Sequence, residues 1–198
     1  MDSIRRRMME HVDSPYTRLS YIESDGTTGS YLNTGIKAYT NTNLEIKFQS
    51  AAAFAASHHV IMGCCRETSS NNLGIDMYTA DDAASNGRVY TGSTNIEGNF
   101  TSGINEVALN GTTCTVNGTD YSVTRSTFSY NYNIYLFAEL HQSSARYRCA
   151  GRIYYVKIWR GSTLVGDFIP VKNNQTNEYG FLNLVDDTFH TNTNITGG

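Results

Sequence analysis

The sequence predicts an all-β fold in which antiparallel strands form two packed sheets. Tyrosine and glycine are frequent, with 14 and 17 residues, while charged residues make up only 17%. This composition favours strands and turns over helices. The stretch 150–173 has the pattern of two long strands joined at a glycine turn, and residues 104–124 have that of short strands between Asn-Gly turns. With 198 residues and no visible linker, the chain is expected to form one domain.

The first predicted element is a short helix over residues 2–13. An apolar stripe of Ile4, Met8 and either His11 or Val12 runs along it, beside Arg5, Arg6 and Arg7. So short a helix is not stable alone in water, so the segment is expected either to fray or to order against a partner. Pro15 ends it, because the residue before a proline disfavours helical geometry. We therefore place an attachment segment at residues 1–15 and the β domain at 16–198.

The strands that follow are short and separated by polar turns. Residues 43–49 alternate apolar and polar side chains, so one face of that strand is expected to be buried. A turn at Asp25-Gly26 separates the first two strands. Strands before the 104–124 stretch are expected at residues 19–24, around 31–32, and at 43–49, 60–64, 73–78 and 88–90.

Residues 104–124 predict a meander with two-residue turns at Asn110-Gly111 and Asn117-Gly118. Its buried face would consist of Val107, Leu109, Cys114, Val116, Tyr121 and Val123. A further, nearly all-apolar strand is expected at residues 133–140.

The two strands of the 150–173 stretch are predicted to lie inside a sheet. Strict alternation would place Ile153, Tyr155 and Trp159 on one face of the first strand, and Tyr154, Val156 and Ile158 on the other. Both faces would then be apolar apart from Lys157, which is typical of an interior strand. In the second strand, Pro170 is expected to end regular pairing, because proline has no N–H to donate.

Two stretches near the ends of the predicted domain resemble one known fold family. They are YIESDGTTGSYLNTG at residues 21–35, and GRIYYVKIW at 151–159 with TLVGDFIPVKN at 163–173. They resemble the opening and closing signatures of concanavalin A-like lectin/glucanase (laminin G-like) jelly rolls of bacteriophage and bacterial proteins. The opening signature departs from the family pattern by a residue or two inserted around Thr28-Gly29. The resemblance brackets nearly all of the chain after residue 15, and it implies a two-sheet antiparallel jelly-roll β-sandwich with a short N-terminal segment.

The resemblance also implies a function. It suggests a non-enzymatic virion structural and adhesion protein of a bacteriophage, located in a capsid or tail appendage. The segment 1–15 would bind other virion proteins, the chain would form a homo-oligomer, and the jelly roll would lie on the particle surface after assembly in the host cytoplasm. There it would bind cell-surface or mucus glycans. Two alternatives remain open, a bacterial surface carbohydrate-binding module and a glycoside hydrolase.

No catalytic constellation is predicted. Glycosidases need two carboxyl groups at a set separation across the scissile bond. Glu23 and Asp25 have a two-residue spacing, but Asp25 lies in a predicted turn and no third acid follows in the strand. The acid pairs Asp81-Asp82 and Asp186-Asp187 are interpreted as solvated loop residues, with a calcium-binding loop as the alternative.

No metal or cofactor is predicted either. The cysteines are Cys64, Cys65, Cys114 and Cys149, and their spacing matches neither a redox pair nor a paired-knuckle zinc site. They are expected to be reduced and mostly buried. Zinc held by His58, His59 and one of these thiols would need a ligand spacing that the sequence lacks.

A shallow glycan site requires less than catalysis does. It needs an aromatic platform for the apolar face of a pyranose, surrounded by side chains that hydrogen-bond hydroxyl groups. Candidates in or beside loops are Arg66, Asp76, Tyr78, Tyr90, Asn99, Arg146 and Tyr147. The alternative for each of these tyrosines is packing between strands.

Two partner classes are not expected. A net charge of -3 gives no basic footprint for nucleic acid. No apolar run approaches the length that a membrane-spanning segment needs, and no signal peptide is recognised at the N-terminus.

Overall fold

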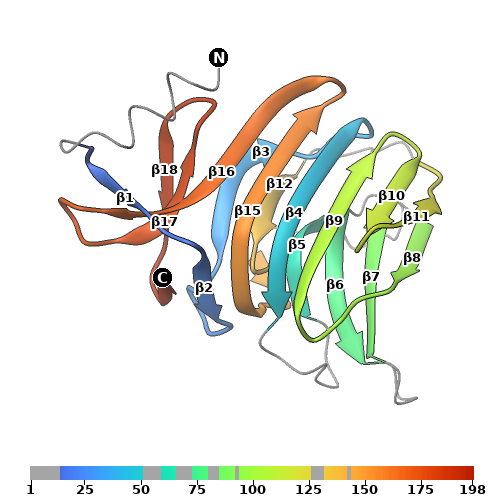
Figure 1. The fold of residues 1–198 in the computed structure, drawn as a ribbon, viewed down its shortest axis with the longest axis horizontal. Helices are drawn as coiled ribbons and strands as arrows, with labels where there is room; N and C mark the ends of the chain where they lie inside the picture. Colours follow the sequence, from blue (N-terminus) through green and yellow to red (C-terminus); the bar gives the residue numbers. More distant parts are fainter. Residues whose placement is uncertain are drawn as a thin grey trace.

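A computed structural model describes residues 14–50, 59–65, 73–79, 85–91, 94–125, 132–141 and 144–198, without the side chains of residues 65, 76–79, 85, 86 and 141. All regular structure in these residues is β, and the strands form two sheets (Figure 1). The predicted all-β jelly-roll sandwich is therefore confirmed. The predicted helix at 2–13 lies outside the described residues, and the boundary at residue 15 stays a prediction. No helix in the described part of the chain is long and apolar enough to span a membrane.

The large sheet is built around the strand pair that the sequence indicated. Its path is β11-β10-β9-β4-β15-β16-β17-β18, with β1 paired to β16, and β2 to both β15 and β19. The strands are β1 Tyr16–Arg18, β2 Ile22–Asp25, β4 Thr42–Ser50, β9 Ile104–Asn110, β10 Thr113–Val116, β11 Thr119–Ser122, β15 Ala150–Arg160, β16 Thr163–Asn173, β17 Tyr179–Asn183, β18 Thr188–Thr191 and β19 Ile195–Gly197.

The small sheet follows the path β14-β13-β5-β6-β7-β8, with β12 paired to β3 and β5. Its strands are β3 Leu32–Lys37, β5 His59–Cys65, β6 Leu73–Thr79, β7 Ser85–Thr91, β8 Thr94–Gly98, β12 Asn133–Leu136, β13 Glu139–His141 and β14 Ser144–Arg146. One pairing breaks the antiparallel rule, because β13 runs parallel to β5.

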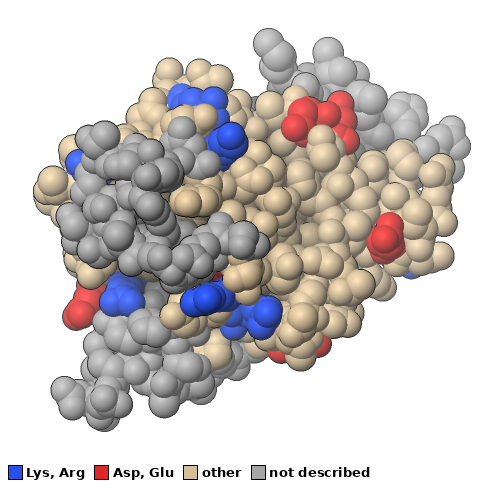
Figure 2. All heavy atoms as spheres, turned by 180° about the vertical axis from the view of Figure 1, so that it is seen from behind, with Lys and Arg blue, Asp and Glu red and all other residues tan. Residues whose placement is uncertain are grey.

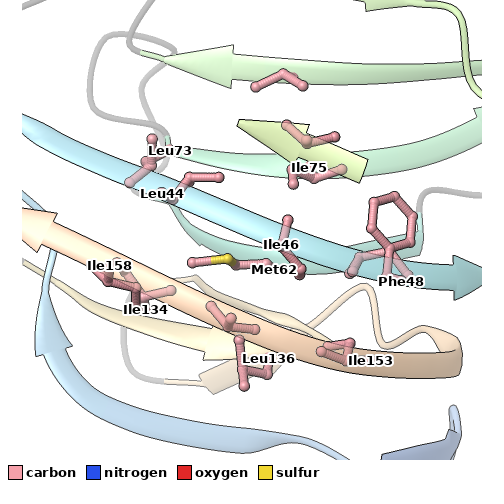
Figure 3. Packing of buried hydrophobic residues seen from close by; sticks show 14 of the residues in the cluster. Leu44, Ile46, Phe48, Met62, Leu73, Ile75, Ile134, Leu136, Ile153 and Ile158 are labelled. Atoms are coloured by element: carbon pink, nitrogen blue, oxygen red, sulfur yellow. The ribbon is translucent and has the colours of Figure 1, made fainter. Parts of the chain in front are cut away.

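The core fills the space between the two sheets. Strand β4 alternates buried and half-buried residues along its whole length, as its sequence predicted. Its Leu44, Ile46 and Phe48 meet residues of the small sheet such as Met62 and Ile75 (Figure 3). Full burial of one such aliphatic or aromatic side chain is worth about 1.5–3 kcal/mol, so this interface between the sheets is the main source of stability.

Strand β15 lies inside the large sheet, as predicted, but its two faces differ from the prediction. A register irregularity between Ile153 and Tyr155 inserts one residue, so Ile153, Val156 and Ile158 are all buried. Tyr154 and Tyr155 are both only half-buried. Strict alternation was therefore wrong here, because a bulge changes which face the following residues occupy.

Pro170 does not end strand β16, contrary to the prediction. It pairs with Phe181 in β17, and β16 continues to Asn173. The pairing of β16 with β15 ends at Phe168, and the carbonyl of Pro170 instead accepts a hydrogen bond from Leu19 N, at 3.0 Å. Pro170, which has no N–H, therefore lies beyond the residues of β16 that pair with β15, and such a position tolerates proline.

The predicted strand 133–140 is divided into β12 and β13. Phe137 between them has a φ of 61°, and its N–H donates to the carbonyl of Ile61 at 2.6 Å. A bulky side chain with positive φ is rare, so an apolar pattern alone could not indicate this break. The chain changes direction here, which lets β12 run antiparallel and β13 parallel to β5.

The meander and the cysteines largely follow the prediction. The first turn is Gly111-Thr112 rather than Asn110-Gly111, since Asn110 still pairs with Thr113. The predicted inward residues are buried, except that Tyr121 is half-buried. The cysteines whose side chains are described are free and buried, and they are Cys64, Cys114 and Cys149. Burial raises the pKa of Cys114 to about 11.

Candidate functional site

A row of directly opposed residues crosses the small sheet from one edge to the other. Opposed residues of neighbouring strands project from the same face. Met62 and Cys64 flank the row and point into the core, so the row lies on the outer face of the sheet. Its members, one from each strand, are Arg146, Glu139, Gly63, Gly74, Tyr90 and Asn95. Five steps between strands make the row about 24 Å long.

Tyr90 lies across the middle of this row. A Cβ atom added at Gly74 would come within 2.7 Å of the Tyr90 ring carbon Cζ, so the ring occupies the space that glycine leaves empty. The Tyr90 hydroxyl reaches β13 and donates a hydrogen bond of 3.1 Å to Oε2 of Glu139. Both residues are buried, with 6% and 5% of their surfaces exposed. Tyr90 therefore cannot be the exposed platform proposed from the sequence, and instead it positions the Glu139 carboxylate.

A second row runs beside the first on the same face. Asp76, Arg88 and Glu97 are directly opposed in β6, β7 and β8, so acidic and basic residues alternate across the sheet. The row continues to Val60 in β5, which is opposed to Asp76. The main-chain N–H of Val60 in turn donates to the carbonyl of Tyr147 at 2.8 Å.

Tyr147 stands at the end of this second row. Its side chain is 44% exposed, and among the described residues only Ile104 is a more exposed large hydrophobic residue. Its φ of 50° lies in the left-handed region, which costs a residue with a side chain about 1–2 kcal/mol. Arg146 precedes it and is exposed. Arg148 follows Tyr147 in the chain, and its Nε is buried without a hydrogen-bond partner among the described residues.

Four of the seven predicted residues thus gather in two adjacent rows: Asp76, Tyr90, Arg146 and Tyr147. Tyr78 lies further along β6 opposite Asn86, and the side chains of Asp76 and Tyr78 are not described. Asn99 follows β8 at the opposite edge from Arg146, so it does not join the group. Arg66 lies outside the described residues, as do the predicted attachment residues Ile4, Arg5, Arg6, Arg7 and Met8.

Glu139 is not among the site residues predicted from the sequence. The only signal was an acidic residue inside an otherwise apolar run, NIYLFAEL. A buried carboxylate needs hydrogen-bond partners, and Tyr90 is 49 residues away in the chain. Only the strand order brings the two residues together.

The acids considered for catalysis have structural roles. Asp25 Oδ1 accepts hydrogen bonds from the N–H of Thr27 at 2.9 Å and from its hydroxyl at 2.7 Å, and these bonds lower the Asp25 pKa. A lowered pKa does not suit a general acid. Glu23 pairs with Arg152 at 3.3 Å.

The two acid pairs and the predicted histidine pair give no metal site in the described part of the chain. Asp186 caps a turn through Thr188 N at 3.0 Å, whereas Asp81-Asp82 lies outside the described residues. His59 Nδ1 lies 3.1 Å from the Arg148 carbonyl, and His58 is not described. No group of three potential metal ligands occurs among the described residues.

Charged residues are sparse on the described surface of the face that is turned away in Figure 1. Figure 2 shows a few scattered Lys, Arg, Asp and Glu residues there, with much of the described surface between them uncharged.

No protein-family model matches the sequence, and no curated protein matches it either. Solved structures match the fold. A candidate carbohydrate-binding protein from Bacteroides ovatus has a TM-score of 0.60 at 13% identity, over 91% of this chain and 60% of that one. The native heptameric SAP-like pentraxin from Limulus polyphemus has a TM-score of 0.54 at 13% identity, over 91% of this chain and 95% of that one. CBM40 of the Ruminococcus gnavus IT-sialidase has a TM-score of 0.44 at 12% identity, over 73% of this chain and 89% of that one.

At these identities the matches establish the fold only. This chain spans about 60% of the length of the Bacteroides ovatus protein. It shares with that protein and with the pentraxin the jelly-roll sandwich described above.

Proposed function

We propose that this chain is a carbohydrate-binding domain that holds a glycan on the outer face of the small sheet, against Tyr147. The observation that carries the proposal is the exposed ring of Tyr147 on a backbone of unfavourable φ, fixed by the bond from Val60 N. Backbone strain of this kind persists only where the surroundings impose it, and it concentrates at functional sites. An exposed, oriented aromatic ring is the platform that the apolar face of a pyranose requires.

Polar groups for hydroxyl recognition lie around this ring. Arg146 is exposed beside it and opposite Glu139, and Asn95 is exposed at the other end of the first row. Guanidinium and amide groups can each make paired hydrogen bonds with neighbouring hydroxyls. Between these ends, Gly63 and Gly74 contribute no side chains, and the Tyr90 ring covers Gly74.

The fold comparison supports this assignment at a coarse level. The Bacteroides ovatus protein, which is a candidate for carbohydrate binding, shares the architecture of this chain. A fold alone does not specify a function, so the proposal rests on the site rather than on the likeness.

For the biological setting, we propose a bacteriophage particle, with the segment 1–15 bound to other virion proteins and the jelly roll facing outward. The resemblance of residues 21–35 and 151–173 to phage and bacterial jelly rolls supports this setting. The alternative is a bacterial surface module, in which the Tyr147 site would bind a glycan in the same way. Mass spectrometry of purified particles, or capsid and tail genes beside the coding sequence, would distinguish the two.

The binding function is tested by affinity electrophoresis in gels that contain a panel of plant, mucin and bacterial polysaccharides. We expect at least one polysaccharide to retard the parent protein, and Tyr147→Ala to weaken that binding about tenfold, the effect of about 1.4 kcal/mol. Ile104→Ala is the matched control, because Ile104 is an exposed hydrophobic residue like Tyr147 but lies on β9 of the other sheet. If no polysaccharide retards the parent, or if Tyr147→Ala binds as the parent does, the proposal is wrong.

A further inference from the structure

The large sheet divides where strand β15 changes its neighbour. Residues 156–160 of β15 pair with β16, whereas residues 150–153 pair with β2. Strand β16 turns away to pair with β1 and β17, and Figure 1 shows β15 and β16 separating below their hairpin. The chain from Leu19 to Tyr21 crosses this gap. It is held by the bond from Leu19 N to the Pro170 carbonyl and by bonds from Ser20 N and Tyr21 N to the Gly198 carbonyl.

The division leaves a hollow, which we call the fork hollow. Its volume is about 510 Å³, within the range of about 300–1,000 Å³ that is typical of ligand pockets. It is lined by Arg18, Leu19, Ser20, Tyr154, Pro170 and Gly198. These residues come from four separate parts of the sequence, and the bulge in β15 places Tyr154 among them.

Tyr154 forms a wall of the hollow whose orientation is fixed from several sides. Its ring meets that of Tyr21 edge to face, with centroids 6.0 Å apart, and its hydroxyl donates to Oε1 of Gln49 at 3.3 Å. The guanidinium of Arg152 lies 4.4 Å from the centre of the Tyr21 ring and pairs with Glu23. Such support holds a binding residue in place before the ligand arrives, which reduces the entropy lost on binding.

The remaining lining combines hydrogen-bonding and apolar groups. Arg18 is exposed, and its guanidinium has no acidic partner within the described residues. Ser20 is exposed beside it, while Leu19 and Pro170 add apolar surface. A ring face, a fork of N–H donors and a hydroxyl group in one small hollow match a ligand that has one apolar face and several hydroxyl groups.

We propose that the fork hollow is a second glycan site, which takes a single pyranose residue against Tyr154 with Arg18 and Ser20 on its hydroxyl groups. It belongs to the large sheet, whereas the Tyr147 site belongs to the small sheet, and neither site requires the other. Two sites on different sheets of one domain would allow the protein to bridge separate glycan chains, and they would raise its avidity for a dense glycan surface.

The test uses saturation-transfer NMR on the full chain with the methyl pyranosides of glucose, galactose, mannose and N-acetylglucosamine. The starting variant is Tyr147→Ala, which removes the other site. We expect at least one pyranoside to give signals with this variant. Adding Arg18→Ala should weaken its binding about tenfold, and adding Ser20→Phe, which fills the hollow, should abolish it. Arg18 and Ser20 are exposed, so both substitutions should leave the fold intact.

Lys37→Ala is the matched control, because Lys37 is an exposed cation on β3 of the small sheet. It should bind as the starting variant does. The inference is overturned if no pyranoside gives signals with Tyr147→Ala, or if Arg18→Ala and Ser20→Phe leave the signals unchanged. Signals that persist in Tyr147→Ala and are lost on adding Ser20→Phe support the fork hollow, whereas the Tyr147 site is tested by the polysaccharide electrophoresis described above, so the two proposals fail separately.

Discussion

The hydroxyl of Tyr90 donates a hydrogen bond of 3.1 Å to the buried carboxylate of Glu139, across Gly63 and Gly74 of the small sheet. A second Tyr-Glu pair of the same length joins Tyr155 to Oε1 of Glu45, but it lies on a half-buried surface. The two pairs differ in burial, so comparing them tests how burial affects this interaction.

We expect Tyr90→Phe to lower the free energy of unfolding by about 1–3 kcal/mol, because it removes a hydrogen-bond donor from the buried carboxyl group of Glu139. Tyr155→Phe should cost less than about 1 kcal/mol, since water can replace the lost donor. Burial and the nearby Glu45 raise the pKa of Tyr155 to about 12, so its hydroxyl still donates at neutral pH. Urea unfolding of both variants checks this, and equal losses would show that Glu139 is not held as described.

The second prediction concerns hydrolysis. Hydrolysis needs two carboxyl groups at a defined separation, and among the described acids Glu139 accepts a hydrogen bond from Tyr90 while Glu23 pairs with Arg152. Incubation with the bound polysaccharide should release no reducing sugar. Turnover by the parent protein that disappears in Glu139→Gln would instead make the outer face of the small sheet an active site.

Stability should also fall in mild acid because of His190. Burial lowers its pKa below 6.5, outweighing the opposing effects of the Asn33 carbonyl and Asp186. The folded state thus binds protons less readily than the unfolded state does, so the contribution of His190 is complete above pH 6.5 and is lost as the pH falls toward the lowered pKa. His190→Gln should make the urea midpoint less dependent on pH between 6.5 and the lowered pKa of His190. Parallel pH profiles for parent and variant would contradict this assignment.

The N-terminal segment gives a prediction from the sequence alone. If residues 1–15 attach the protein to a particle, changing Ile4 and Met8 to aspartate should abolish incorporation or self-association, because it breaks the apolar stripe. The melting temperature of the sandwich should hardly change. Sedimentation and co-purification with particles measure the first effect, and unchanged assembly would move the attachment surface to the sandwich.

Local patterns predicted local structure well. The alternation in β4, the glycine turn between β15 and β16 and the meander of β9, β10 and β11 depend on neighbouring residues, and all three are present, with the first turn of the meander shifted by one residue. The errors at Tyr154, Phe137 and Pro170 have a common cause. At each position the chain changes its strand neighbour or its register, and such a change depends on partners that are distant in the sequence.

The site was predictable only in part, for the same reason. Arg146 and Tyr147 could be selected because they lie in a polar loop-like stretch, but their alignment with Glu139 and Val60 depends on the order of β14, β13 and β5. The fork hollow could not be anticipated at all. It exists because β15 exchanges β16 for β2.

We propose that Tyr147 is kept exposed in an unfavourable backbone conformation in order to bind a glycan. The most direct measurement compares Tyr147→Gly with Asn177→Gly in a thermal melt and in polysaccharide affinity. Both residues have left-handed φ values, of 50° and 60°, and glycine relieves that strain at either position. Both variants should therefore melt at or above the parent temperature, and only Tyr147→Gly should weaken polysaccharide binding, by about tenfold. If Tyr147→Gly binds the polysaccharide as tightly as the parent and Asn177→Gly do, Tyr147 does not bind the glycan.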